Sequence, residues 1–247
     1  MNFFSLFKRK LIYKIKKKHN IDLENKNKDS LDALFNYYGS DKAVVIKNTN
    51  DQGHGFSKYY VKHLINLKKK ETKILEIGSF AGASAAAFSK YFENSKIYCL
   101  DVNISKFNFS SKNINVFGLD INNKQSLHRV IERINLKSNS NFFDVIVDDG
   151  SHYLSDILNT LNNLFRYLKK GGYYIIEDFK YPNYYNYNRD INHIFVDEVI
   201  KNLQEKKIFH SDIIKDKDQI YLHENIKNIE IYRGNLKNSD ICFIEKN

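Results

Sequence analysis

The sequence is short of the residues that cross-link a chain or interrupt its regular structure. Its 247 residues include no tryptophan, one methionine, one proline and two cysteines. Cys99 and Cys242 each lie in an apolar run typical of a strand, which argues against a disulfide framework or a cysteine-rich metal site. We expect both to be small buried side chains in a cytoplasmic protein.

Long apolar segments are absent as well. No stretch reaches the roughly 18 consecutive apolar residues of a membrane-spanning helix, and the N-terminus lacks the apolar run and cleavage site of a secretory signal. The hydrophobic content of 42% still suffices to form a full core. Length and composition together predict a soluble protein with one catalytic domain of roughly 200 residues and a modest extension.

Acidic residues are missing from positions 1–18, which carry seven positive charges: Lys8, Arg9, Lys10, Lys14, Lys16, Lys17 and Lys18. These supply +7 of the net +10, so the rest of the chain is nearly neutral and no nucleic-acid partner is expected. Apolar residues such as Phe7 and Leu11 are interleaved with the basic ones. We predict a basic amphipathic helix over 1–18, and one interpretation is that it contacts the anionic surface at the inner face of a membrane. The alternative is a helix that packs on its own protein or on a partner subunit of a homo-oligomer.

The chain divides into three predicted segments. Residues 1–30 combine the basic helix with a polar linker that starts at His19. Residues 31–72 form a helical cap or lid, with a helix from about Leu31 to Tyr38 that Gly39 ends, a turn-rich loop over 43–57 and a second helix over 59–69. Residues 73–247 form the catalytic domain.

Strand-like and helix-like runs alternate in the catalytic domain. Strands are predicted at 73–77, 96–100, 115–118, 145–147 and 173–176, and helices at 83–91, 125–134 and 157–168. This alternation is typical of an α/β fold with a doubly wound, mostly parallel sheet. Two more strands, 228–232 and 241–245, have only a turn with Gly234 between them. They are expected to form an antiparallel C-terminal hairpin at the sheet edge, which makes a seven-stranded sheet.

A glycine-containing turn follows the first of these strands. The apolar strand carries Glu76 near its end, and a turn with Gly78 and Gly82 leads into a helix of small residues. A ligand lies beyond the carboxyl end of such a strand, and the glycines allow its close approach. Phe80 stands where a dinucleotide fingerprint has its middle glycine, and Glu76 would crowd a pyrophosphate. A nicotinamide cofactor is therefore disfavoured.

Further acids follow the next two strands. Asp101 ends the second strand, where a carboxylate can accept hydrogen bonds from two ribose hydroxyls, and Asp120 follows the third. The order of these acids after Glu76 resembles the order in which class I methyltransferases present acids to the methionine, ribose and adenine of S-adenosylmethionine. The predicted cofactor residues are Glu76, Gly78, Ser79, Gly82, Ser84, Asp101, Asp120 and Asp148.

Acids also end the fourth and fifth strands, as Asp148-Asp149 and Glu177-Asp178. If these strands are neighbours, about 4.8 Å apart, their carboxylates converge and repel one another unless a cation neutralises them. An all-oxygen set favours magnesium, calcium or manganese over zinc. His152 follows closely and is a candidate general base for a hydroxyl whose pKa the cation has lowered. The alternative for His152 is a capping or solvated side chain.

These motifs together resemble the macrocin and mycinamicin type of sugar O-methyltransferase, a metal-dependent class I family. The resemblance covers most of residues 35–247. It rests on residues 38–42 (Tyr-Gly-Ser-Asp-Lys), His54-Gly55-Phe56, the glycine turn, residues 148–152, Gly171-Gly172 and Ile176-Glu177-Asp178. It implies a Rossmann-like methyltransferase fold, S-adenosylmethionine and magnesium as cofactors, and a sugar hydroxyl as acceptor. It also implies Asp149, Glu177 and Asp178 as metal ligands, with His152 and Asp149 catalytic. The chain departs from the family pattern at Phe80 and Ala81, where glycines are usual.

The acceptor is predicted to be a small molecule or a glycan, such as a precursor of a surface polysaccharide or a secondary metabolite. His54, in a loop that is a candidate lid, and Tyr181, in a tyrosine-rich segment around Pro182, are candidate acceptor contacts. The alternative for the tyrosine segment is a packed or dimer-contacting loop. The alternative functions are methylation of a non-sugar acceptor, such as a phosphoryl substituent or a small phenol, and a non-catalytic S-adenosylmethionine-binding module.

Overall fold

The computed structural model describes residues 3–24, 30–47, 49–136, 142–185 and 194–247. The helices are α1 Phe3–Ile15, α2 Leu31–Tyr38, α3 Ser57–Leu64, α4 Ala83–Tyr91, α5 Lys124–Leu136, α6 Leu154–Leu164, α7 Tyr181–Tyr184, α8 Val196–Gln204 and α9 Asp216–Asn225, with 3-10 turns η1 Ile21–Leu23, η2 Ile65–Leu67, η3 Ile104–Lys106 and η4 Phe165–Tyr167. The strands are β1 His19–Asn20, β2 Glu71–Ile77, β3 Asn94–Asp101, β4 Phe109–Ser110, β5 Ile114–Gly118, β6 Phe143–Asp148, β7 Leu168–Glu177, β8 Ile226–Arg233 and β9 Asp240–Lys246.

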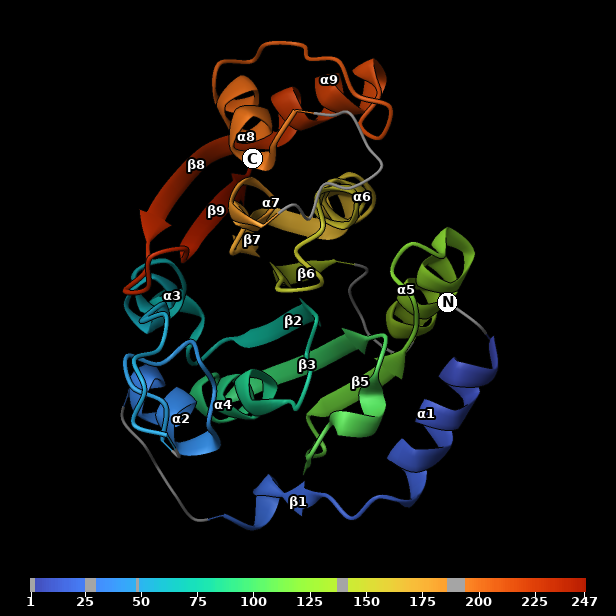
Figure 1. Cartoon of the computed structure of the whole chain (residues 1–247), viewed down its shortest axis with the longest axis vertical. Helices are drawn as coiled ribbons and strands as arrows, with labels where there is room; N and C mark the ends of the chain where they lie inside the picture. Colours follow the sequence, from blue (N-terminus) through green and yellow to red (C-terminus); the bar gives the residue numbers. More distant parts are fainter. Residues whose placement is uncertain (1–2, 25–29, 48, 137–141, 186–193) are drawn as a thin grey trace.

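The main sheet has seven strands in the order β5-β3-β2-β6-β7-β9-β8. The five strands from β5 to β7 are parallel, whereas β9 runs antiparallel to both β7 and β8. Figure 1 shows this twisted sheet with β8 and β9 at one end and β5 at the other. The predicted fold class is confirmed, including the terminal hairpin and the pairing of the fourth and fifth catalytic-domain strands.

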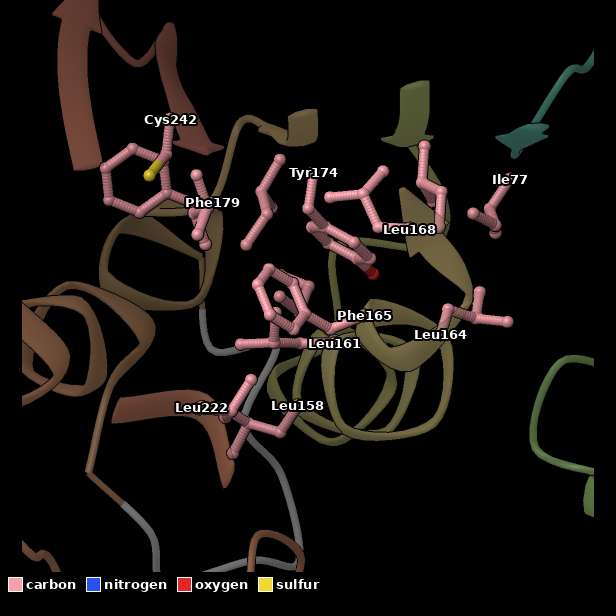
Figure 2. Packing of buried hydrophobic residues seen from close by; sticks show 14 of the residues in the cluster. Ile77, Leu158, Leu161, Leu164, Phe165, Leu168, Tyr174, Phe179, Leu222 and Cys242 are labelled. Atoms are coloured by element: carbon pink, nitrogen blue, oxygen red, sulfur yellow. The ribbon is translucent and has the colours of Figure 1, made fainter. Parts of the chain in front are cut away.

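Successive residues of each strand enter two different cores, because side chains alternate across a sheet. In β6, Ile146 packs into the core with α5, α6 and α8, and Val145 and Val147 pack into the core with α2, α3 and α4. Figure 2 shows the first core, in which leucines of α6 pack beside Tyr174 of β7. Apolar residues on both faces are therefore what a sheet covered on both sides requires. Cys99 and Cys242 are free and buried, as predicted.

Helices α2 and α3 of the predicted cap (31–72) share a core with the catalytic domain. Phe35 of α2 and Tyr60 of α3 lie in the core that contains Phe88 of α4, with the rings of Phe35 and Phe88 5.4 Å apart. Helix α2 ends as predicted, at Gly39 in the left-handed conformation (φ +80°), and Ser30 caps its first turn by accepting from the Ala33 amide.

The predicted linker after residue 18 is wrong in its first half. His19 and Asn20 pair in parallel with Phe109 and Ser110 as β1 and β4, and Ile21 is fully buried. The polar composition of this segment favoured a linker, but the pairing of β1 with β4 holds the backbone of residues 19 and 20 against a distant part of the chain. Residues 25–29 lie outside the described part. Among the helices of the described ranges, none has both the length and the apolar character needed to cross a membrane.

Candidate functional site

A cavity of about 570 Å³ lies over the carboxyl ends of β2, β3 and β6. The predicted cofactor residues Gly78, Ser79, Ser84, Asp101 and Asp120 line it, and so do Asp149 and His152. Residues 39–42, after α2, form another part of its wall. The cavity thus joins the glycine turn to Asp149 of the predicted metal site, whereas Glu177 and Asp178 do not line it. Its volume is in the usual range for a small-molecule site.

The glycine turn is shaped by two residues with positive φ. Gly78 (φ +83°) lies so close to β6 that a Cβ atom there would be 1.8 Å from the carbonyl oxygen of Asp149. Gly82 (φ +82°), directly before α4, would place a Cβ 2.5 Å from the ring of Phe107. The positive φ angles and the close protein contacts therefore require glycine at both positions. Phe80, at φ +42°, is strained and 60% exposed.

Glu76 is fully buried beside the cavity, although it is not among the residues that line it. One carboxylate oxygen accepts a hydrogen bond from the Ser84 hydroxyl at 2.5 Å, and the other makes no hydrogen bond with the described residues. Burial raises the pKa of Glu76 to about 7, against the opposing effects of the Lys42 charge and Ser84. An unsatisfied buried acceptor of this kind fits a ligand that brings a donor or a positive charge.

Asp101 and Asp120 lie where the sequence placed them, at the edge of the cavity that is formed by the ends of β3 and β5. The two Asp101 oxygens accept from the backbone amides of Phe80 at 2.8 Å and Asn103 at 2.5 Å. These bonds fix the carboxylate toward the glycine turn. Since each carboxylate oxygen has two acceptor sites, Asp101 retains capacity for hydroxyl donors.

Asp148 does not line the cavity, and its predicted role in cofactor binding stays a prediction. It is buried and accepts hydrogen bonds from Thr160 of α6 and, at 3.3 Å, from Tyr174 of β7. Burial raises its pKa to about 7. Asp148 is the last residue of β6, and the side chain of the next residue, Asp149, takes the opposite direction and reaches the cavity.

Asp149, His152 and Asp178 form a cluster in which one ligand atom from each lies within 4.8 Å of the others. His152 and Asp178 both have positive φ, +58° and +50°, which is uncommon for residues other than glycine and marks strain of the kind found at functional sites. Nε2 of His152 lies 3.7 Å from Oδ1 of Asp149. One Asp178 oxygen is buried without a hydrogen bond to the described residues. The donor set fits a divalent cation.

Lys42 is the main feature that sequence reasoning missed. Its side chain is fully buried, and its ammonium lies 2.5 Å from Oδ2 of Asp149 and 2.7 Å from Oε2 of Glu177. The hydroxyl of Tyr60 donates to the other Glu177 oxygen. Burial opposes the charge of Lys42, but Asp149 and Glu177 outweigh this effect and raise the pKa of Lys42 well above its usual value. The only sequence signal was the position of Lys42 in the motif that follows α2.

Glu177 therefore lies beside the cluster in a different set of contacts. Both of its carboxylate oxygens have protein partners, Lys42 and Tyr60. Burial raises the pKa of Glu177 to about 8, although Lys42 lowers it. The metal-ligand role that the family resemblance implies for Glu177 stays a prediction.

The two candidate acceptor residues lie next to the cluster. The ring of Tyr181 in α7 is 5.2 Å from that of His152. Nδ1 of His54 is 2.8 Å from the Ser239 hydroxyl and 3.5 Å from an Asp178 oxygen. Burial lowers the pKa of His54, but Asp178 outweighs burial and raises it. Both side chains therefore lie next to the cluster, from segments far apart in the sequence, although neither lines the cavity.

The loop over 43–57 folds back on the segment before it rather than extending from the body. The backbone amides of His54 and Phe56 donate to the carbonyls of Asp41 and Lys42, at 2.7 and 2.9 Å. Ile46 from this loop lines the cavity. A lid role remains a prediction.

Comparisons with known proteins give one family and a consistent set of relatives. A family described as "Methyltransferase domain" matches residues 68–232. The mycinamicin VI 2''-O-methyltransferase of Micromonospora griseorubida is 28% identical over 132 residues, 51% of this chain and 31% of that protein. The L-olivosyl-oleandolide 3-O-methyltransferase of Streptomyces antibioticus is 29% identical over 155 residues, 60% of this chain and 36% of that protein. The matched part is thus about a third of the length of these relatives.

Among solved structures, MycE methyltransferase from the mycinamycin biosynthetic pathway, in complex with Mg and SAH, superimposes with a TM-score of 0.67. The sequence identity is 23%, and the match covers 89% of this chain and 55% of that one. This likeness confirms the fold.

Proposed function

Because the chain belongs to the methyltransferase domain family, we propose that it transfers the methyl group of S-adenosylmethionine to a hydroxyl of a sugar, with a divalent cation, expected to be magnesium. One observation carries the proposal: a single cavity joins the glycine turn and Asp101 to Asp149 and His152. The names of the curated relatives, which are O-methyltransferases of glycosylated natural products, support a sugar acceptor. A MycE complex with Mg, SAH and mycinamycin VI supports the same cofactors.

The cofactor would lie along the glycine turn, with its methionine part near Glu76 and its ribose at Asp101. The unsatisfied, buried Glu76 oxygen suits the positive charge of the methionine part. Asp101 is held toward the turn by the Phe80 amide, which orients its free acceptor sites toward ribose hydroxyls. Asp120 lies at the far end of the same wall, where the adenine would be.

A cation would be held by Asp149 and Asp178, with His152 within reach of the same position. Glu177 is the further ligand implied by the family resemblance, and it would join the set by exchanging its contact with Lys42. The cation supplies positive charge that orients neighbouring sugar hydroxyls and lowers the pKa of one of them. Oδ1 of Asp178 fits such a ligand, because it is buried without a hydrogen bond to the described residues and its nearest charged partner, Nδ1 of His54, lies 3.5 Å away.

His152 acts as the general base in this proposal. Asp149, 3.7 Å from Nε2, orients the imidazole and stabilises its protonated form. The acceptor oxygen attacks the methyl carbon in line with the sulfur as the carbon–sulfur bond breaks, His152 takes the hydroxyl proton, and S-adenosylhomocysteine leaves. Tyr181, beside His152, would face the sugar ring, and His54 would contact an acceptor hydroxyl.

The test is a methyl-transfer assay with labelled S-adenosylmethionine against nucleotide sugars, glycosides and polysaccharide fragments. Excess chelator should abolish turnover and magnesium should restore it. His152→Ala should lose roughly 10²–10⁴-fold in rate while its affinity for S-adenosylhomocysteine, measured by calorimetry, stays nearly unchanged. The matched control is His128→Ala, which removes an exposed histidine of α5. Full activity in chelator would refute the cation, and a normal rate for His152→Ala would refute the base.

A further inference from the structure

Helix α1 is attached to the rest of the protein through its polar face. Nη1 of Arg9 donates to the carbonyl of Val102 at 3.0 Å, and Nζ of Lys16 donates to the carbonyl of Ser105 at 3.2 Å. The ring of Tyr13 packs edge-on against Phe107, with centroids 6.3 Å apart. These contacts hold α1 against the segment that follows β3, beside β5 in Figure 1.

Several apolar residues of α1 face the solvent as a result, whereas Leu6 and Tyr13 are partly buried against the protein. Phe7, Leu11 and Ile15 are 61%, 50% and 76% exposed, and Phe4 is also exposed. Their spacing of three or four residues places them on one stripe of the helix, which we call the α1 stripe (Phe4, Phe7, Leu11 and Ile15). A surface helix normally buries such a stripe and exposes its polar face. This helix does the reverse, which marks the stripe as an interaction surface.

Positive charge surrounds the α1 stripe. At 100° per residue, Lys8 lies on one side of the stripe and Lys14 on the other, and both are exposed. Lys17, just beyond the helix, is exposed too, and no acidic residue occurs among the first 18 positions. A second copy of α1 placed on the stripe would bring the same positive charges. A lipid bilayer with anionic headgroups matches the helix better, because its apolar interior suits the α1 stripe and its headgroups suit the lysines beside the stripe.

We propose that α1 binds the surface of an anionic phospholipid bilayer. The α1 stripe enters the boundary between headgroups and acyl chains, and Lys8, Lys14 and Lys17 contact lipid phosphates. The polar face stays bound to the 102–107 segment, whose first residue lines the cofactor cavity. The membrane contact thus involves a surface separate from the proposed reaction site and does not depend on the identity of the acceptor.

The experiment is co-sedimentation of the full chain with two kinds of vesicle, pure phosphatidylcholine and phosphatidylcholine with 30% phosphatidylglycerol (roughly the anionic content needed for such attraction). A charge variant carries Lys8→Gln, Lys14→Gln and Lys17→Gln. Its control carries Lys201→Gln in α8, Lys206→Gln just after α8 and Lys217→Gln in α9, all at exposed positions. A stripe variant carries Phe7→Ser, Leu11→Ser and Ile15→Ser. Its control carries Ile208→Ser, Ile220→Ser and Ile231→Ser, at exposed isoleucines elsewhere.

Wild type should bind the anionic vesicles much more tightly than the neutral ones. The charge variant should lose roughly fivefold in partition coefficient for each lysine removed, and the stripe variant about tenfold or more, while both controls bind like wild type. Equal binding to both vesicles, no binding, or equal losses in variants and controls would overturn the proposal. The proposal would also be overturned if light scattering showed that the wild type is a dimer and the stripe variant a monomer, because a second copy would then cover the stripe. Unfolding midpoints and S-adenosylhomocysteine affinity are measured for every variant, to show that each is folded.

Discussion

Removing the charge of Lys42 is the perturbation that tests the interior of the site most directly. Lys42→Met keeps most of the side-chain volume but leaves the partly exposed carboxylate of Asp149 and the buried one of Glu177 without the ammonium that now lies 2.5 and 2.7 Å from them. Breaking a buried ion pair by removing one partner typically costs about 3–5 kcal/mol. In a chain of this size, each kcal/mol lowers Tm by roughly 2–4 °C, so a decrease of roughly 6–20 °C is expected.

The assay is thermal and urea unfolding in chelator at pH 8.5 and at pH 6. Burial raises the pKa of Glu177 to about 8 although Lys42 lowers it, so loss of Lys42 raises this pKa further. At pH 6 a proton can then replace the missing ammonium, and the loss of stability should be smaller than at pH 8.5. Magnesium should also restore part of the stability, because a cation at Asp149 neutralises one of the two negative charges that the missing ammonium leaves uncompensated. Lys42→Met combined with Glu177→Gln should be more stable than Lys42→Met alone, since the amide can still accept from Tyr60.

The control is Lys58→Met, at an exposed position of α3. A loss below about 1 kcal/mol for Lys42→Met, the range of exposed ion pairs, would refute the buried-pair reasoning. If Lys42→Met combined with Glu177→Gln is no more stable than Lys42→Met alone, the proposed role of the contact between Lys42 and Glu177 is refuted.

The remaining predictions concern the cofactor wall and the buried acid behind it. Asp101→Ala should weaken S-adenosylhomocysteine binding by about 2–4 kcal/mol, because two hydrogen bonds to a charged acceptor are lost. Unchanged affinity in calorimetry would show that the ribose does not bind at Asp101. Gly78→Ala should lose both stability and affinity, whereas Gly171→Ala should lose stability only, since it has a similar φ of +70° but no atom within 4 Å of its Cβ; equal affinities of the two variants would contradict the proposed close approach. Burial raises the pKa of Asp148 to about 7, so the folded state holds a proton that the unfolded state releases above pH 4. The stabilising effect of that proton is complete below pH 4 and is lost as the pH rises through 7. The free energy of unfolding should therefore fall with pH more steeply in wild type than in Asp148→Asn, by up to about 1.4 kcal/mol per pH unit, and parallel urea-unfolding profiles of the two proteins would rule this out.

The sequence by itself determined the sheet and the place of the site. Strands such as β6, in which three consecutive residues (145–147) are apolar, are stable only when covered on both faces. Their alternation with helices leaves a parallel sheet as the simple solution. Local chemistry then located the cavity, because Gly78 allows a turn that other residues resist and acids at the ends of adjacent parallel strands must converge. These features depend on neighbours in the sequence or on strand order, so they can be read without coordinates.

Only the tertiary structure decided which side chain of the Asp148-Asp149 pair reaches the cavity. Asp148 and Asp149 are equivalent in sequence, but neighbouring residues point to opposite faces of a sheet, and the register of β6 turns Asp148 toward Thr160. The contact of Lys42 with Glu177 spans 135 positions, and no local pattern encodes it. The orientation of α1 was equally hidden, because its sequence specifies an apolar stripe and a basic face but not which of them meets the protein. The hydrogen bonds of Arg9 and Lys16 to backbone carbonyls settle that choice, and they turn the stripe outward.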